Sequence, residues 1–189
     1  KSAYKFYTIG QFIHRKGIAE TIEAYCKSFQ TKDNVVLFVK TFGKDYSLEE
    51  QRTCLEKIKN IIGDLNIPPV VFLNQMFTYD EIQSLHEQCD CYVQLTRSEG
   101  FGLGIFEAYN KGKKLIVTNY GGHTEYLPKS YEGLVQYEMV PVTDPIYTNF
   151  ELDQTYEWAK PIILHAKKLL LTMSTINKDV YASGDIFNL

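Results

Sequence analysis

Short apolar segments alternate with longer amphipathic segments along most of the chain. The apolar segments contain few polar residues, which is typical of parallel strands that are covered on both faces. Each is followed by a stretch whose apolar residues recur every three or four positions, as on the buried side of a helix. The predicted strands are residues 4–9, 35–42, 70–73, 91–96, 115–118 and 134–142.

Two of the predicted helices begin with the spacing of a capping box. Ser47 is followed three positions later by Glu50, and Thr78 is followed in the same way by Glu81. In this motif the two side chains bond each other's backbone amides, so both pairs predict helix starts. The predicted helices are residues 18–29, 48–63, 79–89 and 101–110, with a short helical turn at 124–127.

Repeated alternation of strand and helix favours right-handed crossovers between neighbouring parallel strands. The pattern therefore predicts an α/β fold: a Rossmann-like, doubly wound, mostly parallel sheet of about six strands with helices on both faces. The C-terminal part is less regular. After two prolines, residues 154–173 are predicted as a terminal helix that is kinked or restarted at Pro161, and residues 174–189 as a tail.

Composition narrows the possible partners. The 189 residues carry a formal net charge of -3, so no global basic field exists to hold nucleic acid. No apolar run approaches the ~18–20 residues that a membrane span needs. Because the chain begins with a strand-like segment rather than with Met, we expect residues 1–189 to be a single excised domain.

The four cysteines do not form the spacing of a metal site. Cys89 and Cys91 are separated by one residue, too close for the usual zinc loop, and no histidine pair follows them. We therefore expect no bound metal. Free thiols in a reducing compartment are the simplest interpretation, which favours a cytoplasmic location.

Candidate chemistry lies in the loops after the strands, where ligands bind in open parallel sheets. After the fourth strand, Gly100, Gly102 and Gly104 expose the amides at the start of a helix, which suits a phosphate. Glu99 precedes this helix and Glu107 lies about two turns further on, each suited to accept hydrogen bonds from sugar hydroxyls. The alternative is a glycine-rich turn in which Glu99 is only a capping carboxylate.

Two further loops carry polar residues at strand ends. Arg15 and Lys16 stand at the entrance of the first helix, where positive charge opposes the helix dipole, so an anion is expected there. The alternative is a pair of solvated cations. In the loop after the fifth strand, Gly121 and Gly122 precede His123, which we expect at the surface.

These three loops together resemble the family-4 retaining glycosyltransferases of the GT-B fold, over about residues 4–130 and weakly over 157–161. The most specific element is the E-x7-E motif, matched by Glu99 and Glu107. Lys16-Gly17 before it and Gly121-Gly122 after it occur in the same order and at family-like spacing.

The resemblance implies a role for each matched residue. Lys16 is expected to neutralise the donor diphosphate and Glu99 to approach hydroxyls of the transferred sugar. Amides near Gly102 and Leu103 are expected to meet the phosphate or sugar, and Glu107 to accept hydrogen bonds from the ribose hydroxyls. The nucleobase is expected to lie near Met76. Further donor contacts are expected at Gly10, Gln11, Thr96, Gly100 and Phe101.

The sequence departs from the family at two positions. Gln11 stands where an arginine is usual, so one diphosphate cation is missing, and Arg15 is our candidate to replace it in catalysis. Leu95-Thr96 stands where Pro-Ser is usual, although Thr96 retains a hydroxyl.

The function implied is sugar transfer, of hexosyltransferase type, from a UDP- or GDP-sugar to a glycan, lipid or protein acceptor with retention of configuration, as in polysaccharide biosynthesis. No cofactor or metal is expected. This chain is expected to be the C-terminal donor-binding domain, inactive alone, because the N-terminal acceptor-binding domain is absent. Peripheral membrane association of the full-length enzyme is compatible with a lipid-linked acceptor.

Two alternatives come from other functional classes. Loss of the usual arginine at Gln11 favours a nucleotide-sugar-binding module without activity. The run Gly100, Gly102, Gly104 is also compatible with an NAD-binding oxidoreductase domain, but that fingerprint follows the first strand of its unit, whereas this run follows the fourth.

Overall fold

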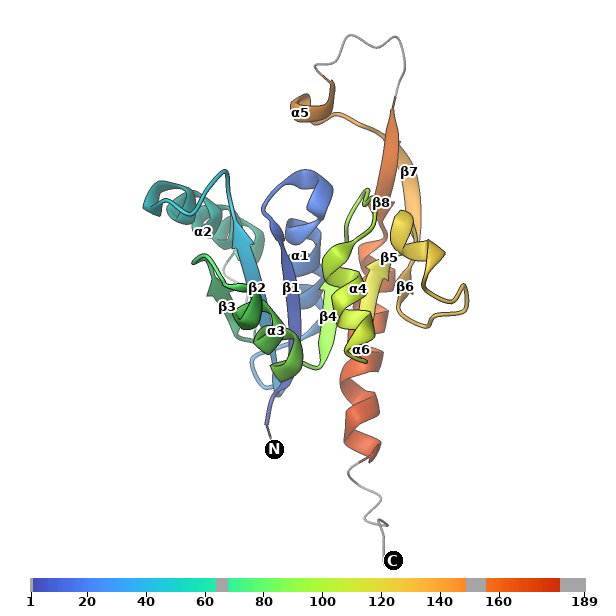
Figure 1. Ribbon diagram of the computed structural model, residues 1–189. Helices are drawn as coiled ribbons and strands as arrows, with labels where there is room; N and C mark the ends of the chain where they lie inside the picture. Colours follow the sequence, from blue (N-terminus) through green and yellow to red (C-terminus); the bar gives the residue numbers. More distant parts are fainter. Residues whose placement is uncertain (1, 64–67, 149–155, 181–189) are drawn as a thin grey trace, which may run out of the picture.

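The computed structural model describes residues 2–63, 68–148 and 156–180, with side chains through residue 175. Its centre is a six-stranded sheet of order β3-β2-β1-β4-β5-β6 in which all the pairings are parallel (Figure 1). The predicted fold class is therefore confirmed. The strands are β1 (Tyr4–Gln11), β2 (Val35–Phe42), β3 (Val70–Leu73), β4 (Cys91–Gln94), β5 (Lys114–Thr118) and β6 (Leu134–Val135).

Helices cover both faces of the sheet, and each face has its own apolar core. The helices α1 (Ile18–Ser28), α2 (Leu48–Ile62) and α6 (Ile163–Val180) pack on one face, against side chains such as Phe6 and Leu37. The helices α3 (Tyr79–Gln88) and α4 (Leu103–Asn110) pack on the other, against Tyr7 and Leu115. Alternation along the strands thus supplies two buried faces, as a doubly wound sheet requires.

The predicted capping boxes have different outcomes. At α3 the box is complete, because Thr78 and Glu81 bond each other's amides. At α2 the Ser47 hydroxyl accepts from the Glu50 amide, but the Glu50 carboxylate accepts from the Lys44 amide instead. The Ser47 amide donates to Asp45, so the second half of that predicted box is wrong.

The region after β5 corrects the prediction most. The predicted strand 134–142 is two strands, since β7 (Tyr137–Pro141) leaves the main sheet and pairs antiparallel with β8 (Glu157–Pro161). β8 lies inside the predicted terminal helix, which instead begins at Ile163. Trp158 and Ala159 are buried, so tertiary packing has overridden a helix-like spacing. The β7–β8 ribbon rises above the carboxyl edge of the sheet, with the short α5 (Pro145–Thr148) near its tip (Figure 1).

The predicted tail also starts later than expected. Helix α6 continues through Val180, and the rest of the predicted tail, 181–189, lies outside the described residues, as do residues 154–155 of the predicted terminal helix. The predicted turn at 124–127 is a 3₁₀ helix at Gly122–Glu125, and a second one lies at His14–Lys16 before α1.

Candidate functional site

Two glycines bring the three predicted loops together at the carboxyl edge of the sheet. Gly17 has a φ of 64°, and a Cβ there would collide with the carbonyl oxygen of Leu95 at the end of β4. A Cβ at Gly122 would likewise collide with the carbonyl of Gly100. The loops after β1, β4 and β5 can therefore touch only because these positions have no side chain.

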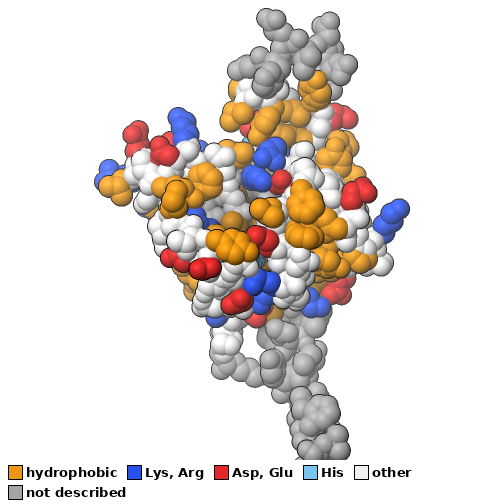
Figure 2. Space-filling view, in the orientation of Figure 1, with side chains coloured by type: hydrophobic (Ala, Val, Ile, Leu, Met, Phe, Trp, Pro, Cys, Tyr) orange, Lys and Arg blue, Asp and Glu red, His pale blue; other side chains and the backbone are white. Residues whose placement is uncertain are grey.

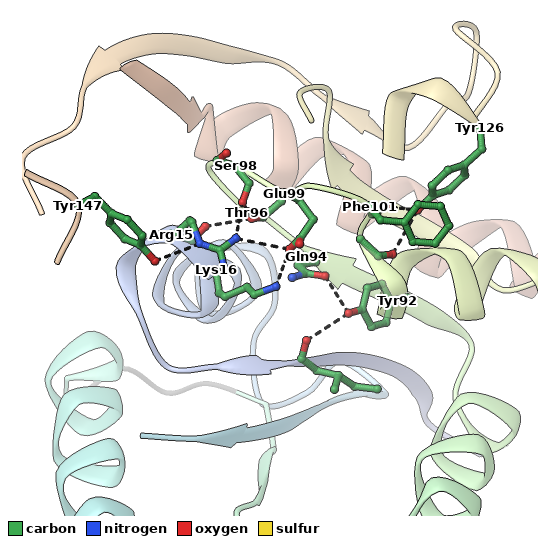
Figure 3. A network of polar contacts seen from close by, with 12 residues as sticks. Arg15, Lys16, Tyr92, Gln94, Thr96, Ser98, Glu99, Phe101, Tyr126 and Tyr147 are labelled. Carbon is green, nitrogen blue, oxygen red and sulfur yellow. Dashed lines mark hydrogen bonds and ion pairs between the residues drawn. The ribbon is translucent and has the colours of Figure 1, made fainter. Parts of the chain in front are cut away.

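Two cations converge on one carboxylate between these loops (Figure 3). The Lys16 Nζ lies 2.5 Å from Glu99 Oε2, and Arg15 Nη1 lies 3.8 Å from the same oxygen. The Glu99 side chain is only 12% exposed, whereas those of Lys16 and Arg15 are 23% and 27% exposed. The three predicted catalytic residues are thus neighbours, and the cations remain open to solvent.

Two hydrogen bonds fix the guanidinium of Arg15 in addition to its contact with Glu99. Its Nη1 donates to the carbonyl of Ser98 at 2.7 Å, and its Nε donates to the hydroxyl of Tyr147 at 3.1 Å (Figure 3). Tyr147 belongs to α5, near the tip of the β7–β8 ribbon, so this part of the chain contacts Arg15. A guanidinium that is hydrogen-bonded through two of its nitrogens loses little further conformational entropy when it binds an anion.

Thr96 connects the loop after β4 to the loop after β1. Its side chain is fully buried, and its hydroxyl lies 3.0 Å from the carbonyl oxygen of Arg15 and 3.1 Å from that of Ser98. The structure therefore places Thr96 where it joins the two loops, with no surface left for a ligand. Thr96 was expected to contact the nucleotide-sugar donor. That contact does not fit this arrangement, because the buried hydroxyl already lies against two backbone carbonyls.

The start of α4 has free amides. Gly102 is its N-cap with a φ of 75° and offers no side-chain cap, and the first intrahelical bond runs from Phe106 N to Gly102 O. Within the described residues, the amides of Leu103 and Gly104 therefore have no hydrogen-bond acceptor. The loop before them is held by Tyr126, whose hydroxyl lies 3.2 Å from the carbonyl oxygens of Phe101 and Gly102.

Hydrophobic side chains gather beside this helix start. The Phe101 ring packs against those of Phe106 and Tyr126 at centroid distances of 5.0 and 5.4 Å. Figure 2 shows hydrophobic side chains grouped over α4, next to Lys and Arg side chains that meet acidic ones near the centre of the face. Leu103 is exposed as well, so the amides lie between a charged cluster and an apolar rim.

Glu107 is partly exposed at the next turn of α4. Its side chain is 22% exposed, and its Oε2 lies 3.6 Å from Nε2 of the fully buried His86. Burial lowers the pKa of His86 to about 4, so this histidine is neutral and the contact is not an ion pair. His86 was not among the predicted site residues, because in the sequence it is only one polar residue beside Leu85 on an otherwise apolar helix face.

The other predicted contacts are placed as follows. Gly10 lies beside the side chain of Lys16, and a Cβ added at Gly10 would make ordinary van der Waals contact with it. The side-chain amide of Gln11 donates to the carbonyl of Gly43 at 2.9 Å, which turns it toward the loop after β2. A Cβ added at Gly100 would point into open space, and Met76 is 72% exposed in the loop between β3 and α3.

The expectation that His123 lies at the surface is wrong. The side chain is fully buried, and its Nε2 lies 2.6 Å from the carbonyl oxygen of Thr118. The 3₁₀ turn after Gly121 folds the ring back under the loop, and burial lowers its pKa. His123 therefore supports the loop that touches Glu99 through Gly122, whose amide donates to the Glu99 carbonyl at 2.9 Å.

A third cation near the site, Arg97, is structural. Arg97, just after β4, forms a 2.6 Å ion pair with Glu20 of α1, and its guanidinium lies 5.4 Å from the ring centre of Trp158 in β8. The Ala159 amide also donates to the Arg97 carbonyl at 2.9 Å. Arg97 thus anchors the β7–β8 ribbon, a role that was not predictable from the sequence because Glu20 and Trp158 are distant from it in the chain.

Other site classes find little support in the described residues. Within ranges 2–63, 68–148 and 156–180, no three metal-ligating side chains cluster. None of the helices seen there is long and apolar enough to cross a bilayer. A cavity of about 290 Å³ does lie between α3 and the sheet, lined by Phe38, Leu73, Phe77 and Leu85 among others, away from Lys16 and Glu99.

Comparison with known proteins decides the family. The model of the family "Glycosyl transferases group 1" matches residues 1–138. The chain belongs to this family. A curated relative, an uncharacterized glycosyltransferase of Methanocaldococcus jannaschii, is 27% identical over 127 residues, which are 67% of this chain and 32% of the relative. This group 1 glycosyltransferase chain therefore spans about a third of that relative's length.

Solved structures share the fold at low sequence identity. The C-terminal domain of a group 1 family glycosyl transferase from Francisella tularensis is 20% identical, with a TM-score of 0.56 over 97% of this chain and 87% of that one. The catalytic domain of the Helicobacter pylori cholesterol-α-glucosyltransferase is 20% identical, with a TM-score of 0.54 over 71% and 77%. A TarM mutant from S. aureus is 15% identical, with a TM-score of 0.59 over 96% and 30%. These likenesses confirm the GT-B type of architecture.

Proposed function

We propose that this chain is the donor-binding domain of a retaining glycosyltransferase and holds a nucleoside-diphosphate sugar at the carboxyl edge of its sheet. The observation that carries the proposal is the pairing of Lys16 and Arg15 with the single Glu99 carboxylate, beside the free amides of α4. A cluster of this kind presents two cations and a helix N-terminus to one anion.

The diphosphate is the anion that these groups suit. When the bond from the anomeric carbon to the diphosphate oxygen breaks, its electron pair stays on that oxygen. Lys16, Arg15 and the amides of Leu103 and Gly104 stabilise this charge without rearranging. The acceptor hydroxyl attacks the anomeric carbon from the same face, and its proton passes to the leaving phosphate.

Glu99 then has a sugar-positioning role. Its Oε2 faces Lys16, so the diphosphate shares this cation with the carboxylate rather than replacing the pair. The other oxygen is left to accept hydrogen bonds from hydroxyls of the transferred hexose. Because Glu99 is bound to a cation already, it is a poor nucleophile, which favours attack by the acceptor over a covalent glycosyl-enzyme intermediate.

The nucleoside extends along α4 in this proposal. Glu107 accepts from the ribose hydroxyls, and the base lies against the loop that carries Met76. UDP and GDP are the candidate carriers, with UDP favoured because the structurally similar TarM mutant was solved in complex with UDP. No metal is needed, since Lys16 and Arg15 supply the positive charge that a divalent ion would otherwise provide.

The acceptor belongs to another domain. Because the chain spans about a third of its curated relative, we propose that a separate N-terminal domain binds the glycan, lipid or protein acceptor. This chain alone is then expected to bind a nucleoside diphosphate weakly and to transfer no sugar. Peripheral association with a membrane is part of the proposal only for a lipid-linked acceptor.

Calorimetry on this chain tests the proposal. UDP or GDP should bind, NAD should not, and Lys16→Ala should weaken nucleotide binding. Lys27→Ala is the matched control, because Lys27 also forms a 2.5 Å ion pair, with Glu23, but on the exposed side of α1. Binding that Lys16→Ala and Lys27→Ala alter equally, or a preference for NAD, would refute the proposed donor site.

The second candidate is a nucleotide-sugar-binding module without activity. The contact of Gln11 with Gly43 favours it, because the side chain at the position of the usual arginine is turned toward another loop. Full-length protein that binds the donor but neither hydrolyses nor transfers its sugar would support this candidate over the enzyme.

A further inference from the structure

A buried tyrosine–histidine pair stands behind the carboxylate of Glu107. Tyr7 of β1 and His86 of α3 are both fully buried, and the Tyr7 hydroxyl lies 2.7 Å from His86 Nδ1. On its other side, His86 Nε2 points to Glu107 Oε2 at 3.6 Å and has no hydrogen-bond partner among the described residues. The imidazole therefore bridges the sheet and the partly exposed carboxylate.

The proton on this imidazole can be assigned from its two neighbours. If Nδ1 carried the proton, it would donate to Tyr7, and the phenolic proton would be buried without an acceptor. The lone pair of Nε2 would then face a carboxylate. If Nε2 carries the proton, Tyr7 donates to Nδ1 and the Nε2–H faces Glu107. The second arrangement pairs the buried phenol and directs the Nε2–H toward a carboxylate, whereas the first leaves the phenolic proton without an acceptor and sets a lone pair against a negative charge.

Burial keeps both groups in the required protonation states. It raises the pKa of Tyr7, so the phenol retains its proton. It lowers the pKa of His86 to about 4, so the imidazole stays neutral near pH 7 with a single N–H.

We propose that His86 is a positioning residue for the donor nucleotide, whose Nε2–H holds one oxygen of Glu107 so that the other is presented to the ribose hydroxyls. This inference rests on the proposed function, in which Glu107 accepts from the ribose. The 3.6 Å separation exceeds a hydrogen bond, and we expect it to shorten when the ribose engages the carboxylate, as contacts in ligand-free sites often do.

The benefit comes from reduced side-chain freedom. A partly exposed glutamate samples several rotamers and loses that freedom when it binds a ligand. A fixed donor at its inner oxygen restricts those rotamers before the nucleotide arrives. The effect should appear only for ligands that carry ribose hydroxyls.

The test compares UDP with 2′-deoxy-UDP by calorimetric titration; if GDP binds more tightly, the guanosine pair replaces them. Wild-type protein should prefer the ribonucleotide by about tenfold, as expected for a hydrogen bond to a charged group. His86→Leu, which removes the donor, should lower that preference by about threefold or more. His86→Gln retains one acceptor and one donor and should restore it.

Leu85→Ala is the matched control, because Leu85 is the neighbouring buried residue of α3. Loosening of the helix should weaken both nucleotides equally and leave their ratio unchanged. A His86→Leu protein that keeps the wild-type ratio would overturn the positioning role alone. Failure of wild-type protein to bind either nucleotide would instead refute the proposed function.

A measurement on wild-type protein covers the case in which His86→Leu fails to fold. Long-range ¹H–¹⁵N NMR spectra distinguish the two neutral tautomers of histidine without any ligand. The inference requires the Nε2–H form of His86 at pH 7, and the Nδ1–H form would overturn it.

Discussion

Replacement of Arg15 by alanine tests whether this residue supplies the second diphosphate cation. In the ligand-free site, Lys16 and Arg15 lie 2.5 and 3.8 Å from the same carboxylate oxygen. At an effective dielectric constant of about 20, Coulomb's law gives gross attractions to this oxygen of about 7 kcal/mol for Lys16 and about 4 kcal/mol for Arg15. The attraction of Arg15 for a negative charge at this place is therefore roughly two thirds of that of Lys16.

Net contributions to ligand binding are smaller. A hydrogen bond to a charged group contributes about 1.5–3 kcal/mol, so Lys16→Ala should weaken nucleotide binding by about 10- to 150-fold. Two thirds of that free energy gives about 5- to 30-fold for Arg15→Ala, nearly as large an effect. Arg15 is also fixed by Ser98 and Tyr147, so no large ordering cost reduces its contribution.

Isothermal titration calorimetry with UDP and GDP measures both variants under the same conditions. Lys27→Ala controls for the loss of one positive charge, because the Lys27–Glu23 pair lies on the exposed side of α1. Unchanged affinity in Arg15→Ala, with a clear loss in Lys16→Ala, would refute the compensation for Gln11.

Further predictions concern catalysis, pH and folding. In the full-length enzyme, Lys16→Ala should lower kcat on the order of 10²–10³-fold, measured with a nucleotide-sugar donor, because one preorganised charge is lost. His86 has a folded pKa of about 4, below its usual value, so the unfolded chain binds the proton more readily. Stability should therefore fall as the pH drops from about 6.5 to about 4, by up to about 3 kcal/mol for this group, and urea unfolding of His86→Gln should lack this component. Gly17→Ala should cost about 3 kcal/mol or more, since its added Cβ meets Leu95 in a left-handed conformation, whereas Gly112→Ala, with a φ of 67° and open space, should cost about 1 kcal/mol in the same assay. EDTA should leave nucleotide binding unchanged; a loss of affinity that added Mg²⁺ restores would contradict the metal-independent site.

The sequence pattern predicted the sheet because each central strand is apolar on both faces. Phe6 and Tyr7, adjacent in β1, enter different cores, and this two-sided burial is what a continuous apolar run indicates. The pattern failed at 157–161, where Trp158 and Ala159 are compatible with either a helix or a strand. Pairing of β8 with β7 is a contact between distant segments, and local periodicity carries no information about it.

The candidate site was predictable where glycines and charges mark a loop. Lys16 and Glu99 lie in separate loops, and the rule that parallel strands share a carboxyl edge was enough to place them together. The groups behind the site were not predictable in this way. His86 contacts Tyr7, which lies 79 residues earlier in the chain, and the burial of His123 depends on how its 3₁₀ turn folds, so neither was visible from a single histidine in the sequence.

The proposed donor site requires that a diphosphate binds the free amides of α4 between Glu99 and Glu107. Backbone amide NMR spectra of this chain, titrated with UDP and GDP, test it most directly. A nucleotide that binds there should shift the resonances of Leu103 and Gly104 strongly, and Lys16→Ala should weaken this response. Saturating nucleotide that leaves both amides unshifted, with changes confined to the cavity beside α3, would contradict it.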